Sequence, residues 1–329
     1  MLKLLGMFDI KEKKMRDLKI CLFTRDSESR LGSVIDNQVY DLTLTYAAYI
    51  HAENKGNNLY TLAKTIVPDT LEYFLLAGTH SIEQVRKSLD YVVSEKITTG
   101  LQGELICHSL DEVRLLAPIH TGTKVICFGD TFVSHYMTGK KLPEGFDENH
   151  PGVFYKMSQV VVGMDDTILI PKAHKGHVVG GTELTVVIGK EGRNIGEDEA
   201  EDYIWGYTIM NDVTLREQLN YMLGPTPKVF DTSAPIGPWI VPKDQIPNPL
   251  DLSLKLRISG HLDQDGSTKL MKFPIANLIS VISKWHTLRP GDILATGDVG
   301  SKHPLNDQDV VEAEVGNIGV LRNYVKKEI

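Results

Sequence analysis

The chain lacks the charge expected of a protein that binds nucleic acid. It has 43 acidic residues against 35 Lys and Arg residues, a formal net charge of -8 at pH 7, whereas phosphate backbones require clustered Lys and Arg. It also lacks any run of about 18 consecutive apolar residues, the length that a membrane-spanning helix needs. We therefore expect neither nucleic acid nor a membrane among its partners.

Cysteine is scarce, and a secretory signal is missing. The three cysteines, Cys21, Cys107 and Cys127, are odd in number and widely spaced. They therefore predict reduced, buried thiols rather than a disulfide framework or a zinc knuckle.

Near the start, the charged residues Lys11 to Lys14 follow a short apolar patch, the reverse of the order in a signal peptide. The expected location is the cytoplasm.

The chain is long enough for two domains. Its 329 residues suffice for one large domain and a smaller one. Short apolar runs with turn signals predict strands between Leu18 and Leu44. Apolar residues three and four apart predict helices over Tyr60 to Ala77 and Ser81 to Val93. Periodicity is lost from Ser94 to Pro118, which predicts an N-terminal α+β domain (1–117) and a second domain (118–329).

The second domain is predicted to be rich in strands. Helices are expected only after Asn211 and from Ile275 to Lys284. The expected strands are Lys124 to Phe128, Gln159 to Val162, Thr167 to Ile170, Glu183 to Ile188, Ile204 to Met210, Trp239 to Val241, Leu252 to Ser259 and Val310 to Val315. This pattern indicates a β-rich α+β fold.

Two acidic residues stand beside these strands. Glu183 begins a run of apolar and β-branched residues, and Asp212 directly follows another. Burying a carboxylate is costly unless it is paired or binds a metal, so the two acids suggest a site for a hard cation with oxygen ligands. The alternative is a pair of strand-edge acids that face water.

Read together with three later motifs, these segments resemble the fumarylacetoacetate hydrolase family. The later motifs are Lys228 to Asp231, Ala234 to Trp239 and Leu288 to Gly297. The resemblance covers nearly the whole chain and implies a mixed β-sandwich roll for the second domain and a homodimer. It also implies an enzyme in which Mg²⁺, Mn²⁺ or Ca²⁺ binds a small 2-oxo acid or 1,3-diketone and stabilises its enolate.

Within that chemistry, the first choice is hydrolysis of a C–C bond. Decarboxylation, isomerisation and hydration of a 2-oxo acid use the same enolate and are close alternatives. A non-catalytic binding protein is the alternative from another class, because the chain departs from the family at several site positions.

The resemblance assigns Glu183 and Asp212 as metal ligands. Many family members have a Glu-x-Glu pair here, whereas this chain has Gly181 at the first position. Asp130, directly after Gly129, resembles an extra aspartate ligand found in the namesake branch, and it is the third candidate ligand. The alternative for Asp130 is a turn residue after glycine.

The resemblance also suggests two catalytic residues. His135 resembles the family histidine that activates a water, a role that suits a near-neutral pKa. The family often has Glu three residues later, where this chain has Thr138. Lys228 resembles the lysine that balances negative charge on the enolate. The alternatives are a structural histidine in a loop and an ordinary surface lysine.

Three residues are candidates for binding the substrate. Arg216, one helical turn after Asp212, is placed to hold a substrate carboxylate or to pair with a nearby acid. Gly297 and Asp298 stand where the family commonly has Gly-Thr-Pro. Asp298 would repel a substrate carboxylate unless it is protonated, paired with Lys302 or pointed away. This departure predicts a changed substrate or a changed orientation.

Overall fold

One long sheet runs through most of the molecule. The computed structural model describes residues 16–25, 28–53, 56–133, 150–217 and 227–329. The strands of this sheet are β1 (Ile20–Thr24), β2 (Arg30–Ile35), β3 (Gln38–Asp41), β4 (Cys107–Ser109), β5 (Arg114–Leu116), β6 (Val125–Gly129), β7 (Gly152–Lys156), β8 (Val161–Val162), β11 (Thr182–Ile188), β12 (Ile204–Asn211), β14 (Ala234–Pro242) and β17 (Ile293–Ala295). The order is β4-β3-β2-β1-β14-β12-β11-β17-β6-β7, with β5 paired to β1 and β8 to β14.

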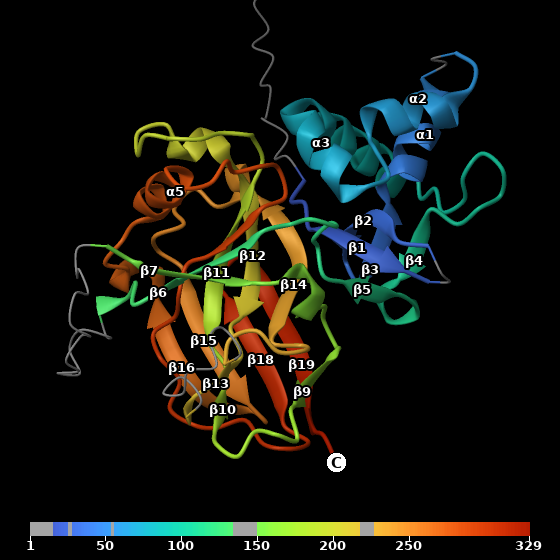
Figure 1. The fold of residues 1–329 in the computed structure, drawn as a ribbon. Coiled ribbons are helices and arrows are strands. Elements are labelled where there is room, and N and C mark those ends of the chain that lie inside the picture. Colours follow the sequence, from blue (N-terminus) through green and yellow to red (C-terminus); the bar gives the residue numbers. More distant parts are fainter. Residues whose placement is uncertain (1–15, 26–27, 54–55, 134–149, 218–226) are drawn as a thin grey trace, which may run out of the picture.

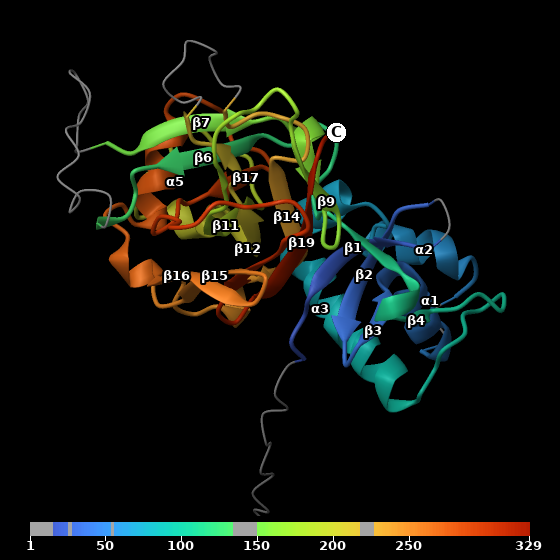
Figure 2. The same ribbon diagram turned by 90° about the horizontal axis from the view of Figure 1, so that it is seen from below.

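A second sheet packs against the middle of the first. It contains five strands in the order β16-β15-β18-β19-β9: β9 (Thr167–Ile170), β15 (Ser253–Ile258), β16 (His261–Ser267), β18 (Val310–Val315) and β19 (Gly319–Lys327). Strands β11, β12 and β14 contact β15, β18 and β19, and Figure 2 shows the two layers. Leu184, Ile209, Leu256 and Val311 are fully buried in the core they share. The expected β-rich α+β fold is confirmed.

The side chains of β11 point alternately into two hydrophobic cores. Leu184 and Val186 belong to the core between the sheets, whereas Val187 belongs to a second core on the opposite face. Since successive side chains in a strand point to opposite faces, both faces of β11 are covered. This burial explains why the second half of the strand, Val186 to Ile188, is a continuous apolar run.

Helices gather mainly in the N-terminal part, as Figure 1 shows. They are α1 (Leu42–Ala52), α2 (Leu59–Ile66) and α3 (Leu71–Ser94), and α5 (Ile275–Ser283) lies in the second part. Gly78 interrupts α3 with a φ of 65°, close to the gap between the two helices that the sequence predicts. The first of these was expected to run from Tyr60 to Ala77, but the chain breaks it around Pro68 into α2 and the start of α3.

The N-terminal part joins the rest through the long sheet and a common core. In the sheet, β1 pairs with β14, with Ile20 opposite Ile240. In the core, the ring of Phe74 from α3 meets the ring of Trp205 from β12 edge-on, 5.8 Å between centroids. The division at residues 117 and 118 stays a prediction, and the sheet continues across it.

The remaining expectations concern single segments. The helix expected after Asn211 falls partly on residues 218–226, outside the described residues; before them the chain forms β13 (Thr214–Leu215), paired with β10 (Val178–Val179). All three cysteines are free, with Cys21 and Cys127 buried and Cys107 half-buried. None of the helices in the described ranges is long and apolar enough to cross a membrane.

Candidate active site

Glu183 and Asp212 lie at the same end of two paired strands, β11 and β12, in the middle of the long sheet. Thr182 of β11 lies opposite Asn211 of β12, so Asp212 leaves β12 where β11 begins. The Asp212 amide donates a hydrogen bond to the carbonyl oxygen of Gly181 at 2.8 Å. Glu183 is 1% exposed and Asp212 is 4% exposed. The alternative of two strand-edge acids facing water is therefore wrong.

Two lysines hold the Asp212 carboxylate. Lys228 Nζ donates a hydrogen bond to Oδ2, and Lys156 Nζ lies 3.0 Å from Oδ1 as an ion pair. Lys156 also donates to the carbonyl oxygens of Val213, Lys228 and Ser233, at 3.1, 2.5 and 2.8 Å. Lys156 therefore ties the chain after β12 to the chain before β14 and fixes Asp212 between them.

The lysines keep Asp212 ionised. Burial alone would raise the pKa of Asp212, but the charges and hydrogen bonds of Lys228 and Lys156 lower it overall. For Lys228, burial opposes the charge, yet Asp212, Glu183 and Asp298 raise its pKa above the ordinary value. At neutral pH Lys228 is consequently an ammonium ion and cannot accept a proton.

The pKa of Glu183 is shifted in the opposite direction to that of Asp212. Burial, followed by the negative charges of Asp212 and Asp298, raises its pKa well above the ordinary value, although the amide of Gly297 opposes the shift. That amide donates to Glu183 Oε2 at 2.7 Å. Glu183 is thus a buried carboxylate with too little positive charge near it, which is the situation that a bound cation relieves.

The donors at this site fit a divalent cation by their chemistry. They are buried carboxylate oxygens, which hard cations prefer, and Mg²⁺ is commonly held by only one or two carboxylates with water and substrate oxygens. Within the described ranges, no three His, Cys, Asp or Glu side chains are arranged to hold a metal ion. Glu183 and Asp212 would hold the cation, and water or substrate oxygens would supply the remaining ligands.

The other candidates lie in different surroundings. Asp130 follows β6 with a φ of 53°, the left-handed conformation of a turn. Its role as a ligand stays a prediction. Arg216 is exposed, and its amide donates to the His177 carbonyl oxygen at 3.0 Å. His135 and Thr138 lie outside the described residues.

Gly297 and Asp298 lie beside Glu183, after β17. Gly297 has a φ of 89°, and a Cβ there would lie 2.0 Å from Thr131 Oγ1, so only glycine fits. Asp298 Oδ1 accepts hydrogen bonds from Gln264 Nε2 at 2.9 Å and from the Gly300 amide at 2.5 Å. Their assignment to substrate binding stays a prediction.

Sequence reasoning missed Lys156 and Gln264. Lys156 ends β7, after Phe154 and Tyr155, so it is a charged residue beside a strand, which is the signal that singled out Glu183 and Asp212. Applying that signal to basic residues as well would have found it. Gln264 lies within β16, and the sequence carries no comparable signal for it.

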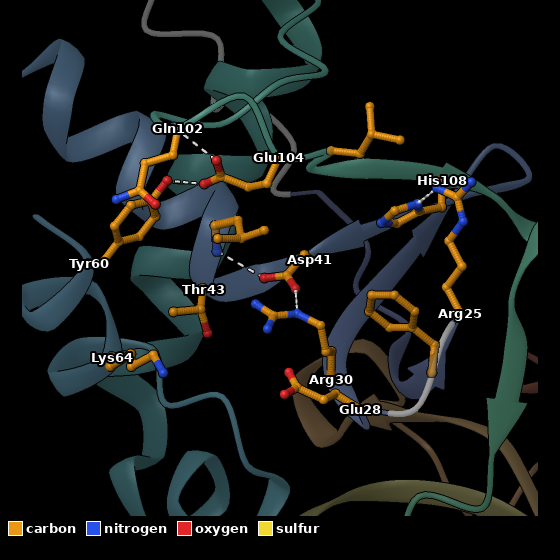
Figure 3. A pocket seen from close by; sticks show the side chains of 13 residues that line it. Arg25, Glu28, Arg30, Asp41, Thr43, Tyr60, Lys64, Gln102, Glu104 and His108 are labelled. Carbon is orange, nitrogen blue, oxygen red and sulfur yellow. Dashed lines mark hydrogen bonds and ion pairs between the residues drawn. The ribbon is translucent and has the colours of Figure 1, made fainter.

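A cavity of about 730 Å³ lies elsewhere, in the N-terminal part. Charged and polar side chains make up most of its lining, and Figure 3 shows several of them paired with one another. Arg30 pairs with Asp41, and Tyr60 donates to Glu104. Because Asp41 and Glu104 are already bound in this way, the cavity is a weaker candidate for the reaction than the carboxylates around Glu183.

Comparison with known sequences agrees with this choice. The family model described as fumarylacetoacetate (FAA) hydrolase C-terminal matches residues 124–326, which include every residue of the carboxylate and lysine cluster. The mitochondrial oxaloacetate tautomerase fahd2 of Xenopus laevis is 37% identical over 272 residues, 79% of each chain. Oxaloacetate tautomerase YisK of Bacillus subtilis is 36% identical over 233 residues, 66% of this chain and 75% of the relative.

Solved structures share the fold over almost the whole chain. The fumarylacetoacetate hydrolase of Exiguobacterium antarcticum is 27% identical with a TM-score of 0.68, covering 94% of this chain and 100% of its own. The maleylpyruvate hydrolase of Sphingobium sp. SYK-6, solved with manganese(II) and pyruvate, is 23% identical with a TM-score of 0.70 and the same coverage. The relatives are enzymes of the hydrolase and isomerase types, and this chain belongs to the fumarylacetoacetate hydrolase family.

Proposed function

We propose that the protein is a divalent-cation-dependent enzyme that interconverts the keto and enol forms of a small 2-oxo acid, with oxaloacetate as the first substrate to test. The observation that carries the proposal is the buried Glu183 and Asp212 pair beside the ammonium group of Lys228. The names of the tautomerases from Xenopus laevis and Bacillus subtilis support this reaction type.

The residues divide the task. A divalent cation held by Glu183 and Asp212 would supply a Lewis acid that stabilises the negative charge of an enolate. Lys228, whose side chain is 25% exposed, adds a second positive charge to the same place. Because Lys228 stays protonated, another group must move the proton at the carbon beside the 2-oxo group. His135 remains the candidate for that step.

Hydrolysis of a C–C bond, the first choice from the sequence, becomes the second candidate. The likeness to the hydrolase of Exiguobacterium antarcticum supports it. Hydrolysis requires a base that activates water, and the family's Glu partner for such a base is replaced by Thr138. Tautomerisation requires only a proton exchange beside the carbonyl, so the residues present support it better.

The test is an assay of both reactions on protein stripped of metal. Added Mg²⁺ or Mn²⁺ should restore the conversion of enol oxaloacetate to its keto form. The loss of enol absorbance measures this conversion. We expect Glu183→Gln and Asp212→Asn to lose at least about 100-fold in turnover, and Glu191→Gln, a change at an exposed acid, to keep it.

Cleavage of an acylpyruvate is measured with the same samples. Cleavage without tautomerisation would favour the second candidate, and neither reaction with any metal would reject both. The homodimer and the cytoplasmic location stay predictions, and the relative from Xenopus laevis is named as mitochondrial.

A further inference from the structure

The side chain of Asp298, rather than the backbone conformation, explains why residue 181 is a glycine. Its φ is not among the positive values of the chain, so the backbone would accept any residue. A Cβ at Gly181 would, however, lie 2.4 Å from Oδ2 and 2.9 Å from Cγ of Asp298, well inside van der Waals contact. The Asp298 carboxylate therefore fills the space that a side chain at position 181 would occupy.

That space is next to Glu183. Gly181 directly precedes β11, and the amide of Gly297, the residue before Asp298, donates to Glu183 Oε2 at 2.7 Å. Asp298 arrives there because β17 pairs with β11, with Ala295 opposite Thr185. Burial and then Asp212 raise the pKa of Glu183 most, and the negative charge of Asp298 adds to that shift.

The carboxylate of Asp298 is held in this position by a buried side chain. Gln264 is 1% exposed; its Nε2 donates to Asp298 Oδ1 at 2.9 Å, while its Oε1 accepts from the Thr182 amide at 2.9 Å. Gln264 thus links Asp298 to the start of β11. With Oδ1 bound to Gln264 and Gly300, it is Oδ2 that faces position 181.

We infer that Asp298 is the third carboxylate of the cation site, supplied by the loop after β17 in place of a side chain at position 181. The inference rests on the proposed function and replaces the assignment of Asp298 to substrate binding. The described residues do not surround one point with three ligands. Asp298 would therefore bind the cation after a side-chain adjustment or through one of the waters that Mg²⁺ retains.

The first experiment changes only the charge of Asp298. In Asp298→Asn the side-chain carbonyl can still accept from Gln264 and Gly300, so the loop should keep its shape. We expect the affinity for Mn²⁺, measured by calorimetric titration of the metal-free full chain, to fall about 10- to 100-fold, the usual effect of altering a supporting ligand. The matched control is Asp265→Asn, an exposed neighbour of Gln264, which should bind as the parent does.

The second experiment moves the carboxylate back to position 181. Gly181→Glu alone places a side chain against Asp298, and we expect it to weaken Mn²⁺ binding or lower the melting temperature. Gly181→Glu combined with Asp298→Ala removes the clash and restores one acid. The double variant should therefore bind Mn²⁺ more tightly than Asp298→Ala alone, a coupling that a double-mutant cycle measures.

The outcomes separate this inference from the proposed function. If Glu183→Gln abolishes Mn²⁺ binding but Asp298→Asn binds as tightly as the parent, the cation site stands and the inference is wrong. If the parent itself binds neither Mn²⁺ nor Mg²⁺, the proposed function is wrong. A double variant that folds, by circular dichroism, but binds no better than Asp298→Ala would also overturn the inference.

Discussion

At the scale of single residues, two lysines contact one carboxylate but have different surroundings. The Lys156 side chain is completely buried, and three carbonyl oxygens accept from it in addition to its ion pair with Asp212. The Lys228 side chain is 25% exposed, and its Nζ lies 4.6 Å from the centre of the Phe154 ring. This difference predicts a structural role for Lys156, whereas part of the Lys228 side chain is accessible to solvent.

Removing each lysine should separate these roles. We expect Lys156→Met to lower the free energy of unfolding by about 3 kcal/mol or more, because it breaks a buried ion pair and leaves carbonyl oxygens without a donor. Lys228→Met should lose less stability, since Lys156 still pairs with Asp212, but should lose most of its turnover. Urea unfolding and steady-state rates measure the two effects. Equal losses of stability in both variants would contradict the division.

The sequence could predict part of this cluster. Glu183 and Asp212 were found because a charged residue beside an apolar strand stands out in the sequence itself. The contact of Asp298 with Gly181 could not be found in this way, because it depends on the pairing of β17 with β11, strands more than a hundred residues apart. The resemblance to the family pointed to position 181 as altered, but only the packing of the strands shows what fills it.

At the scale of elements, α1 is the clearest difference between expectation and structure. Strands were expected as far as Leu44, but β3 ends at Asp41 and α1 begins at Leu42. Its buried side chains include Leu42, Tyr46, Ala47, Ala48 and Ile50, so the helix is apolar on most sides. A helix covered all round shows no polar stripe, whereas helices with an exposed face, such as α3, were predicted by their periodicity.

The start of α1 depends on Asp41. Its Oδ1 accepts from the Leu44 amide at 2.9 Å as an N-cap, and its carboxylate pairs with Arg30. Asp41→Asn keeps a good cap and loses the ion pair, whereas Asp41→Ala loses both. We expect Asp41→Ala to be less stable than Asp41→Asn by about 1 kcal/mol, the usual value of a cap, in urea unfolding. Equal stability of the two variants would show that the cap contributes nothing.

At the scale of the whole molecule, the two parts share one sheet and one core. The core on the outer face of the long sheet combines Leu18, Ile20 and Phe74 from the N-terminal part with Trp205 and Ile236 from the second part. At the rim of this contact, Arg86 of α3 pairs with Asp244 at 2.7 Å. A shared core of this kind predicts that the second part depends on the first for its stability, although the family match begins only at residue 124.

Residues 118–329 alone should be less stable than the full chain, because they lose the shared core. A chain of residues 118–329 would lose the partner of β14 at Ile20 and uncover Trp205, Ile236 and Ile240, each at most 6% exposed in the full chain. Each large apolar side chain returned to water costs about 1.5–3 kcal/mol, and the uncovered edge of β14 invites pairing with other chains. We expect this shortened chain to bind a hydrophobic dye, to melt at a lower temperature and to self-associate in gel filtration.

A chain of residues 16–329, which keeps every described element, should behave like the full protein. If residues 118–329 instead remain monomeric with an unchanged melting temperature, the two parts fold independently and the shared core contributes little to stability.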